Sequence, residues 1–201
     1  MEIGYAEKEI AIFNGLIKLL RRGANPYQVK VQDIAEAAGI GKGTVYEYFA
    51  SKEEVISKAI LYQLNLEVKA AFRRIAREES LREKFSVLLD LILEWFSDNR
   101  STVNLLLSGG GLHNFYTFLQ EEQQELALLK ENVLRIITHL LEHGRMENVI
   151  SGRESFYYQL MALQGALAGF SHFAGQRDLY PGVTVEEAKN VAYRLLLRAL
   201  N

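Results

Sequence analysis

Hydroxyl and basic side chains recur between residues 42 and 52. These side chains are Lys42, Thr44, Tyr46, Tyr48 and Lys52. Val45 and Phe49 are apolar and stand four apart, so a helix would place them together on its buried face. The other side chains of that helix would point outward, where lysines and hydroxyls can contact the backbone of a nucleic acid.

Two short helices joined by a glycine turn are needed to position these residues. Residues 31–38 predict the first helix, residues 39–41 the turn, and residues 42–49 the second helix. Gly39 suits the turn because glycine adopts a positive φ without strain. Ile40 is expected to fill the space between the two helices. This arrangement is the helix-turn-helix pattern.

The same glycines could also belong to a nucleotide-binding loop, which the spacing disfavours. Such a loop needs a lysine directly before its Ser or Thr and follows a strand. Here Gly43 separates Lys42 from Thr44, and a predicted helix precedes the segment.

Two histidines stand at a spacing that could bind one metal ion. His139 and His143 are four residues apart on a predicted helix. No glutamate follows His139 directly, so the H-E-x-x-H motif is absent. A solvated helix end is the favoured interpretation, and we expect no metal site and no cofactor.

The composition favours an all-helical protein. Of 201 residues 49% are hydrophobic, two are proline and none is cysteine. The lack of cysteine excludes disulfides, thiolate zinc sites and cysteine nucleophiles. No apolar run approaches the roughly 18 residues that span a bilayer, and acidic residues interrupt the N-terminal segment. We therefore expect a cytoplasmic protein without a membrane partner.

Four capping boxes, each a Ser or Thr followed three residues later by Glu, mark candidate helix starts. The pairs are Ser51/Glu54, Ser80/Glu83, Ser151/Glu154 and Thr184/Glu187. Together with the hydrophobic periodicity they predict about nine helices. The predicted ranges are 6–22, 31–38, 42–49, 51–77, 81–99, 105–107, 115–143, 153–176 and 185–200.

The stretch DIAEAAGIGKGTVYEYFASKEEV, residues 33–55, resembles the signature of the TetR family of transcriptional regulators. The similarity covers residues 6–60 and rests on the order of glycines, the T-x-Y-x-Y-F run and the S-K-E-E cap. It implies a helix-turn-helix DNA-binding domain at residues 1–50. Residues 51–201 would form a helical effector-binding and dimerisation domain, with residues 51–77 as its connecting helix.

The resemblance also implies which residues contact DNA. Thr44 and Tyr46 would contact phosphates and bases, and Glu47 could accept a hydrogen bond from cytosine N4. Lys30 stands where the family usually has Thr or Ser; a lysine cannot cap a helix but can bind phosphate. The full set of predicted DNA contacts is Lys30, Lys42, Gly43, Thr44, Tyr46, Glu47, Tyr48 and Lys52.

The resemblance also implies an effector pocket and a dimer interface. It identifies the residues of these two sites less precisely than the DNA contacts. The predicted pocket residues are Trp95, Asn104, His113, Tyr116 and Tyr158, for each of which an ordinary core position is the alternative. The predicted dimer interface contains Gly165, Ala168, Gly169, Val191 and Leu195. Close packing within one chain is the alternative for these small residues.

The sequence thus predicts a ligand-responsive regulator, most simply a repressor, that binds operator DNA as a homodimer and is released by a small molecule. The net charge of −2 opposes this prediction, because DNA-binding proteins usually carry a basic footprint. A helical protein-interaction module without specific DNA binding is therefore an alternative. An all-helical enzyme is a second one, but the chain shows no nucleophile with a base and no paired buried carboxylates, so we do not expect an enzyme.

Overall fold

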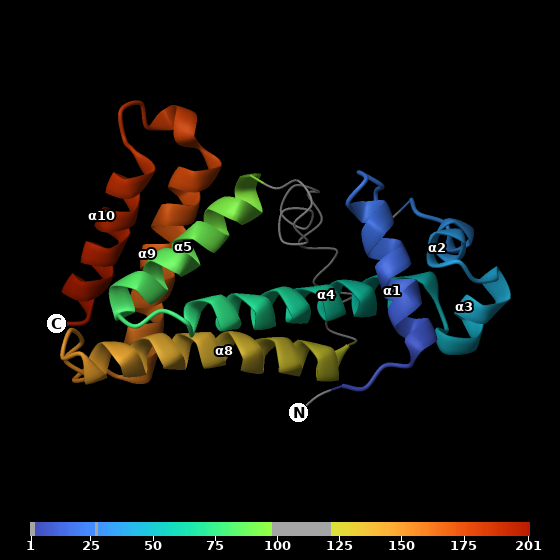
Figure 1. The fold of residues 1–201 in the computed structure, drawn as a ribbon, viewed down its shortest axis with the longest axis horizontal. Coiled ribbons are helices and arrows are strands. Elements are labelled where there is room, and N and C mark those ends of the chain that lie inside the picture. Colours follow the sequence, from blue (N-terminus) through green and yellow to red (C-terminus); the bar gives the residue numbers. More distant parts are fainter. Residues whose placement is uncertain (1–2, 27, 98–121) are drawn as a thin grey trace. The chain divides into compact units, whose positions relative to one another are not determined.

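The computed structural model describes residues 3–26, 28–97 and 122–201 (Figure 1). These residues form eight α-helices and one short 3-10 helix and contain no strand, as the sequence predicts. The predicted helix at 105–107 and the first residues of the one at 115–143 lie outside the described residues. None of the described helices combines the length and the apolar character needed to cross a bilayer.

The chain divides into two compact units. One, the N-terminal unit, runs up to Val68 and includes a second stretch that ends at Asn132. The other, the C-terminal unit, consists of Lys69–Ser97 and Val133–Asn201. Two long helices, α4 (Lys52–Ile75) and α8 (Gln123–Met146), contribute residues to both units.

A single hydrophobic core holds the N-terminal unit together. Its first three helices are α1 (Glu7–Leu20), α2 (Val31–Ala38) and α3 (Lys42–Tyr48). Phe13 of α1, Ile34 of α2, Val45 of α3 and Ile60 of α4 are all fully buried in this core. The Phe13 ring also contacts the Tyr5 ring edge-on at 5.0 Å. Each short helix of the unit is therefore held by its apolar side chains.

Gly15 allows α1 and α2 to approach closely. A Cβ atom at this position would lie 2.9 Å from the backbone nitrogen of Ala38 and 3.0 Å from the carbonyl oxygen of Ile34. Both are backbone atoms and cannot move aside without shifting α2. Any larger residue at position 15 would push the two helices apart.

The C-terminal unit is a second helical bundle. Its remaining helices are α5 (Leu81–Ser97), α9 (Phe156–Gly175), the 3-10 helix η1 (Arg177–Leu179) and α10 (Val185–Ala199). Both α5 and α10 pack against α9. Phe85 of α5, Leu163 of α9 and Leu196 of α10 are buried at its centre. Glu94 of α5 is exposed and pairs with Arg74 of α4.

Two of the four predicted capping boxes form completely, at Ser80/Glu83 and Thr184/Glu187. At Ser51 only the hydroxyl half forms, because the Glu54 carboxylate accepts from the Ala50 nitrogen instead of the Ser51 nitrogen. The Ser51, Ser80 and Thr184 hydroxyls each accept a hydrogen bond from the backbone nitrogen three residues later. The fourth is wrong: the Ser151 hydroxyl donates to the Leu200 carbonyl, and α9 starts at Phe156 with Ser155 as its cap. Residues 153–155 are therefore not helical, because the Ser151 hydroxyl, the predicted cap, binds the Leu200 carbonyl instead of a helix N–H.

Replacing Gly15 by alanine is expected to lower the free energy of unfolding by about 1–2 kcal/mol, because the overpacking outweighs the gain in helix propensity. The matched control is Gly43→Ala in α3, where a Cβ meets nothing within 4 Å. It should leave stability unchanged or raise it by up to about 1 kcal/mol. Urea unfolding of both variants measures the difference; equal stabilities would contradict the close α1–α2 contact.

Candidate nucleic-acid interface

The turn before α3 has the geometry that its glycine predicts. Gly39 adopts a left-handed φ of 72° and ends α2. The next residue, Ile40, donates its backbone N–H to the Ala35 carbonyl at 3.0 Å, which closes the end of that helix. Its side chain is half-buried and packs against the core of the N-terminal unit. Gly41 then starts α3 without a side-chain cap.

The two faces of α3 differ sharply in exposure. Val45 and Phe49 are 1% and 2% exposed, whereas Tyr46 and Tyr48 are 51% and 37% exposed. Two exposed tyrosines on one short helix make this face a candidate interaction surface. The buried pair therefore holds α3 in place and leaves its opposite face open.

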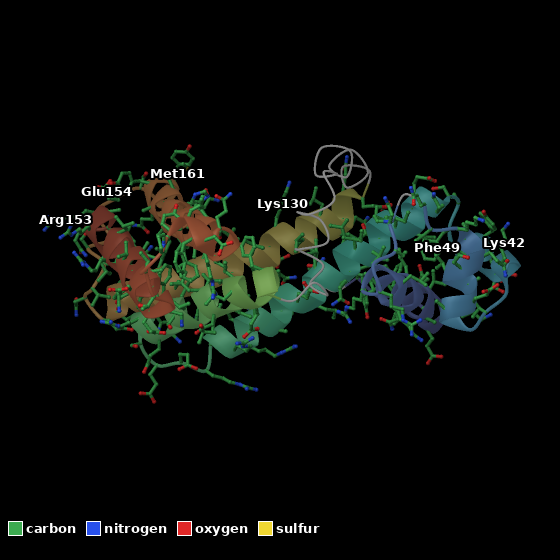
Figure 2. All side chains as sticks on the ribbon, turned by 90° about the horizontal axis from the view of Figure 1, so that it is seen from above. Lys42, Phe49, Lys130, Arg153, Glu154 and Met161 are labelled. Carbon is green, nitrogen blue, oxygen red and sulfur yellow. The ribbon has the colours of Figure 1, made fainter. Side chains whose placement is uncertain are left out.

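The predicted DNA contacts from α3 lie on this open face. Lys42, Gly43 and Glu47 are exposed and Thr44 is half-buried. Figure 2 shows Lys42 at the surface of the N-terminal unit. The face offers an ammonium, hydroxyl donors and a carboxylate, which are groups able to contact phosphates and base edges.

The two predicted lysines outside α3 precede neighbouring helices of the same unit. Lys30 is exposed at the start of α2 and does not cap that helix with its side chain. Instead the Asp33 carboxylate accepts its backbone N–H at 3.1 Å, a capping role that the sequence analysis missed. Lys52 is half-buried at the first position of α4.

The start of α4 is fixed directly after α3. Glu54 accepts hydrogen bonds from the Ala50 backbone at 2.7 Å and from the Lys58 ammonium at 2.8 Å. Burial opposes ionisation of Glu54, but these two donors outweigh it and lower the pKa of the carboxyl. The ionised group thus anchors the turn that follows α3.

A polar network within the N-terminal unit joins the N-terminal segment, α4 and α8. The Tyr5 hydroxyl donates to the buried Glu125 carboxylate at 3.1 Å. The Asn65 amide donates to the Leu61 and Glu125 carbonyls and accepts from Asn132 at 2.9 Å. Burial, with Glu125 next, raises the pKa of Tyr5, so this hydroxyl stays protonated and keeps donating. Sequence analysis did not find these residues.

The predicted dimer residues are exposed on α9 and α10 of the C-terminal unit. Gly165, Ala168 and Gly169 of α9 are exposed, and a Cβ at either glycine would meet nothing within 4 Å. Val191 and Leu195 of α10 are 50% and 55% exposed. Close packing within the chain therefore does not explain these small residues.

Further apolar side chains extend this face along α9. Tyr157 is 70% exposed and Met161 is 50% exposed, and Figure 2 shows Met161 at the helix surface. We call the exposed apolar and small residues of α9 and α10 the α9/α10 face. Its members are Tyr157, Tyr158, Met161, Gly165, Ala168, Gly169, Val191 and Leu195.

Within the part of the chain that the structure describes, the predicted effector-pocket residues do not line a common pocket. Asn104, His113 and Tyr116 lie outside them. Trp95 is half-buried near the end of α5, and Tyr158 is exposed on the α9/α10 face. Their role as a pocket therefore stays a prediction.

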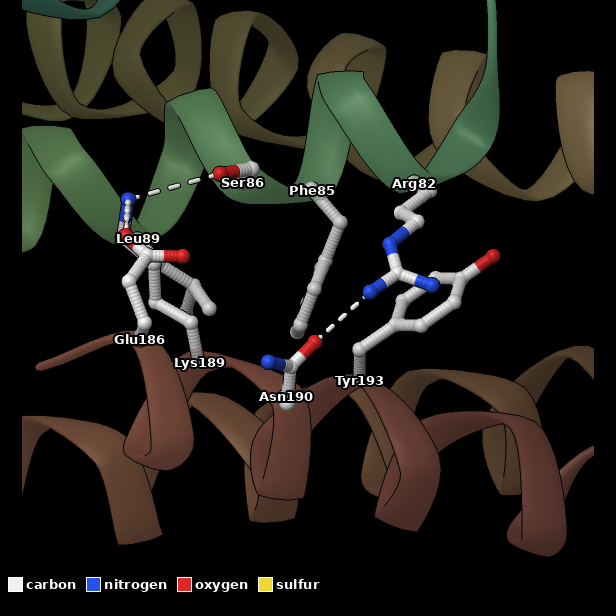
Figure 3. Close-up of a pocket in the computed structure, with 8 residues that line it drawn as sticks. All are labelled: Arg82, Phe85, Ser86, Leu89, Glu186, Lys189, Asn190 and Tyr193. Carbon is white, nitrogen blue, oxygen red and sulfur yellow. Dashed lines mark hydrogen bonds and ion pairs between the residues drawn. The ribbon is translucent and has the colours of Figure 1, made fainter. Parts of the chain in front are cut away.

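The C-terminal unit contains a small cleft between α5 and α10 (Figure 3). Its volume of about 70 Å³ is well below that of an ordinary ligand pocket. Its cations already have partners: Arg82 donates to Asn190 at 2.7 Å, and Lys189 pairs with Asp90 at 2.5 Å. This cleft is a polar seam between two helices and not a candidate effector site.

The two histidines of α8 contact each other, with their ring planes tilted by 58°. The His139 and His143 rings lie 4.4 Å apart, and the Phe72 ring contacts His139 edge-on. Burial, followed by the charge of Lys84 and the neighbouring His143, lowers the pKa of His139. No cluster of three or more potential metal ligands occurs within the part of the chain that the structure describes.

Comparison with known proteins finds similarity to bacterial regulatory proteins. The family model described as bacterial regulatory proteins, tetR family, matches residues 23–59. The chain is 26% identical to the uncharacterised HTH-type transcriptional regulator YuxN of Bacillus subtilis, covering 92% of this chain and 70% of that protein.

Solved structures share the fold. A TetR-family transcriptional regulator from Vibrio parahaemolyticus is 16% identical with a TM-score of 0.64, covering 96% of this chain and 98% of the other. The regulator FadR of Bacillus subtilis, solved with stearoyl-CoA, is 15% identical with a TM-score of 0.60, covering 96% and 97%. At these identities the likeness establishes the fold.

Tyr46→Ala is expected to leave the free energy of unfolding within about 0.5 kcal/mol of wild type, because the ring makes no core contact. Val45→Ala, one residue earlier, should cost about 2 kcal/mol through the cavity it leaves. Thermal and urea unfolding measure both. A large loss from Tyr46→Ala would show that this ring stabilises the fold and is not available for a ligand.

Proposed function

We propose that the chain is a member of the tetR family of bacterial regulatory proteins, which its similarity over residues 23–59 and to YuxN supports, and that it is a ligand-responsive repressor that binds a pseudo-palindromic operator as a homodimer. The observation that carries this proposal is the outward face of α3, whose tyrosines and lysine are exposed while Val45 and Phe49 are buried. The relatives are transcription regulators, so the chain is a helix-turn-helix regulator rather than an enzyme.

In this proposal α3 enters the major groove. Lys42 and Gly43, at its start, approach the base edges most closely, and Thr44 and Tyr46 contact phosphates. Glu47 is placed to accept a hydrogen bond from cytosine N4. Lys30 and Lys52, with Tyr48, hold the flanking phosphate backbone.

The net charge of −2 is compatible with DNA binding if basic groups gather locally. Arg21, Arg22, Lys30 and Lys42 are all exposed in the N-terminal unit. A screened field acts over about 10 Å, so distant carboxylates contribute little at this surface. Few phosphate contacts imply a modest decrease of affinity with salt.

The α9/α10 face supplies the dimer interface in this proposal. A twofold dimer uses the same patch on both subunits, and such a patch must be apolar and accessible in one chain. Helices α9 and α10 of each subunit would form a four-helix bundle. The resulting symmetry would place two copies of α3 in successive major grooves, about 34–36 Å apart.

The effector is proposed to bind among the helices of residues 51–201, with residues 1–50 as the DNA-binding domain. The FadR structure with stearoyl-CoA supports a ligand with an apolar part, since that protein shares the fold. A ligand that binds more tightly to dimers with a different distance between their two DNA-binding domains would weaken operator binding. The expected coupling is about 1–3 kcal/mol per ligand. We place the regulator in the cytoplasm, where operator DNA is available.

Tyr46→Ala is expected to abolish specific binding to the DNA upstream of its own gene, because the ring and its hydroxyl contact the operator. Footprinting and gel shifts at low salt measure this loss, and sedimentation should show an unchanged assembly. Leu66→Ala is the matched control, since this leucine is 42% exposed on α4, away from α3. A Tyr46→Ala variant that still protects the operator would contradict the role of α3.

Gly169→Glu is expected to dissociate the dimer, because it buries a carboxylate without a partner in an apolar interface. Gly4→Glu is the control; this glycine is also exposed with nothing within 4 Å of a Cβ, but it lies in the N-terminal unit. Sedimentation equilibrium measures the molecular mass of both variants, and therefore shows whether each is a dimer or a monomer. A Gly169→Glu protein that remains a dimer removes α9 from the interface.

A further inference from the structure

Two histidines and a phenylalanine form a ring cluster in the C-terminal unit. The ring of His139 on α8 meets the ring of Phe72 on α4 edge-on, with 5.4 Å between their centres. His143 lies one helical turn further along α8, with its ring centre 4.4 Å from that of His139. The Nε2 atom of His139 is shielded from solvent and makes no hydrogen bond within residues 3–26, 28–97 and 122–201. His139 therefore differs from a surface histidine, whose nitrogens water can satisfy.

Protonation of His139 would place a charge and an extra donor at this point. A neutral imidazole has one N–H group and one bare nitrogen, whereas an imidazolium donates from both nitrogens. A buried Nε2 without a hydrogen bond costs less in the neutral ring than in the cation, where it would lack both solvent and an acceptor. Burial is accordingly the main cause that lowers the pKa of His139.

Most of the titratable side chains that act on His139 oppose its protonation. Lys84 of α5 and Arg135 of α8 are cations that disfavour a second positive charge, and the neighbouring imidazole of His143 acts in the same direction. Glu142 of α8 favours protonation, but it is exposed, so solvent screens its charge. The neutral form of His139 is therefore the one that fits its surroundings.

Packing prevents these cations from moving away. The Lys84 side chain is only 1% exposed, and backbone carbonyls accept its ammonium. The Arg135 guanidinium lies 4.3 Å from the centre of the Phe72 ring, the uncharged group that α4 contributes to the cluster. Near the end of α8, a Cβ atom at Gly144 would lie 2.8 Å from Cδ2 of Leu81, the first residue of α5. The two helices thus leave little room to separate the charges while the unit stays packed.

We propose that His139 is a proton-sensitive switch in the C-terminal unit: its neutral ring allows α8 to pack against Phe72 and Lys84, and its protonation in mild acid loosens this packing. The sign follows from linkage. A histidine whose pKa is lower in the folded than in the unfolded protein contributes stability that is complete above the unfolded value of about 6.5. That contribution is lost as the pH falls below this value. The inference concerns the C-terminal unit by itself and does not require that the chain binds DNA or an effector.

The test compares wild type with His139→Phe between about pH 7.5 and about pH 5.5, the range in which histidine titrates. Phenylalanine keeps an aromatic ring against Phe72 but cannot take up a proton. Urea unfolding is followed by the fluorescence of Trp95, the single tryptophan of the chain, which lies on α5 in the C-terminal unit. Relative to His139→Phe, the unfolding equilibrium constant of wild type should rise by up to about tenfold per pH unit below about pH 6.5, because the unfolded state binds one more proton.

The matched control is His172→Phe. His172 is exposed on α9 of the same unit, where its ring contacts Tyr180. This variant should keep the pH dependence of wild type. A merely structural role for the His139 ring predicts that the unfolding constants of wild type and His139→Phe keep the same ratio at every pH, and that result would overturn the proposal.

Two surface variants decide the question if His139→Phe does not fold. Arg135 and Glu142 are both exposed on α8 and act on His139 with opposite sign. Arg135→Gln should raise the pKa of His139 and make the C-terminal unit less sensitive to acid, whereas Glu142→Gln should lower this pKa and make the unit more sensitive. An NMR titration of the His139 imidazole measures the first effect, and urea unfolding measures the second. Unless the two variants change both quantities in opposite directions, the proposal is overturned.

Discussion

A helix of seven residues has no stability of its own, so the whole candidate interface depends on the burial of Val45 and Phe49. Each buried side chain contributes roughly 1.5–3 kcal/mol, whereas Gly41 provides α3 with no side-chain cap. The orientation of α3 is therefore set by its neighbours in the core. Two residues on one face hold the helix. The residues on the other face are therefore not needed for folding, and their types can suit recognition.

Polar contacts add what apolar packing lacks, which is a defined register between long helices. Leucines on two helices can slip past each other at low cost, but the hydrogen bonds of Asn65 with Asn132 and of Tyr5 with Glu125 exist in one alignment only. In the C-terminal unit the buried ammonium of Lys84 donates to the carbonyl of Ile75, the last residue of α4. This bond likewise defines one alignment of α5 with the end of α4. The polar groups of these helices thus define geometry, while the apolar ones supply most of the stability.

Local signals in the sequence predicted the elements of this fold well. The turn at Gly39, the burial of Val45 and Phe49, and the hydroxyl caps at Ser51, Ser80 and Thr184 each depend on residues within one or two helical turns. Local sequence was therefore enough to predict them. The Ser151 box failed because its hydroxyl bonds to the Leu200 carbonyl, a partner 49 residues away. Ser155, four residues later, was an equally good local cap.

Contacts between distant segments explain the other omissions. Lys84 stands among apolar residues of α5, and sequence alone favours a solvated lysine there; its partners are carbonyl groups that no sequence pattern displays. Gly15 likewise resembles any helical glycine until α2 is placed against it. The exposure of the predicted DNA-binding residues on α3 was accessible to local reasoning, because the spacing of Val45 and Phe49 defines the buried face of the helix. The predicted pocket was not, because a cavity is defined by several helices at once.

The weak charge of the chain and its exposed apolar face can be understood together. A single head with a few exposed lysines and arginines would bind DNA weakly at physiological salt. If the α9/α10 face pairs two subunits, the second head binds at an effective concentration near the millimolar range, and the two modest affinities combine. The same pairing relates the two heads by a twofold axis, so a palindromic site would follow from where the apolar residues lie on α9 and α10. Strong positive charge is then unnecessary, and discrimination between sites would depend on the spacing of the two half-sites as well as on their bases.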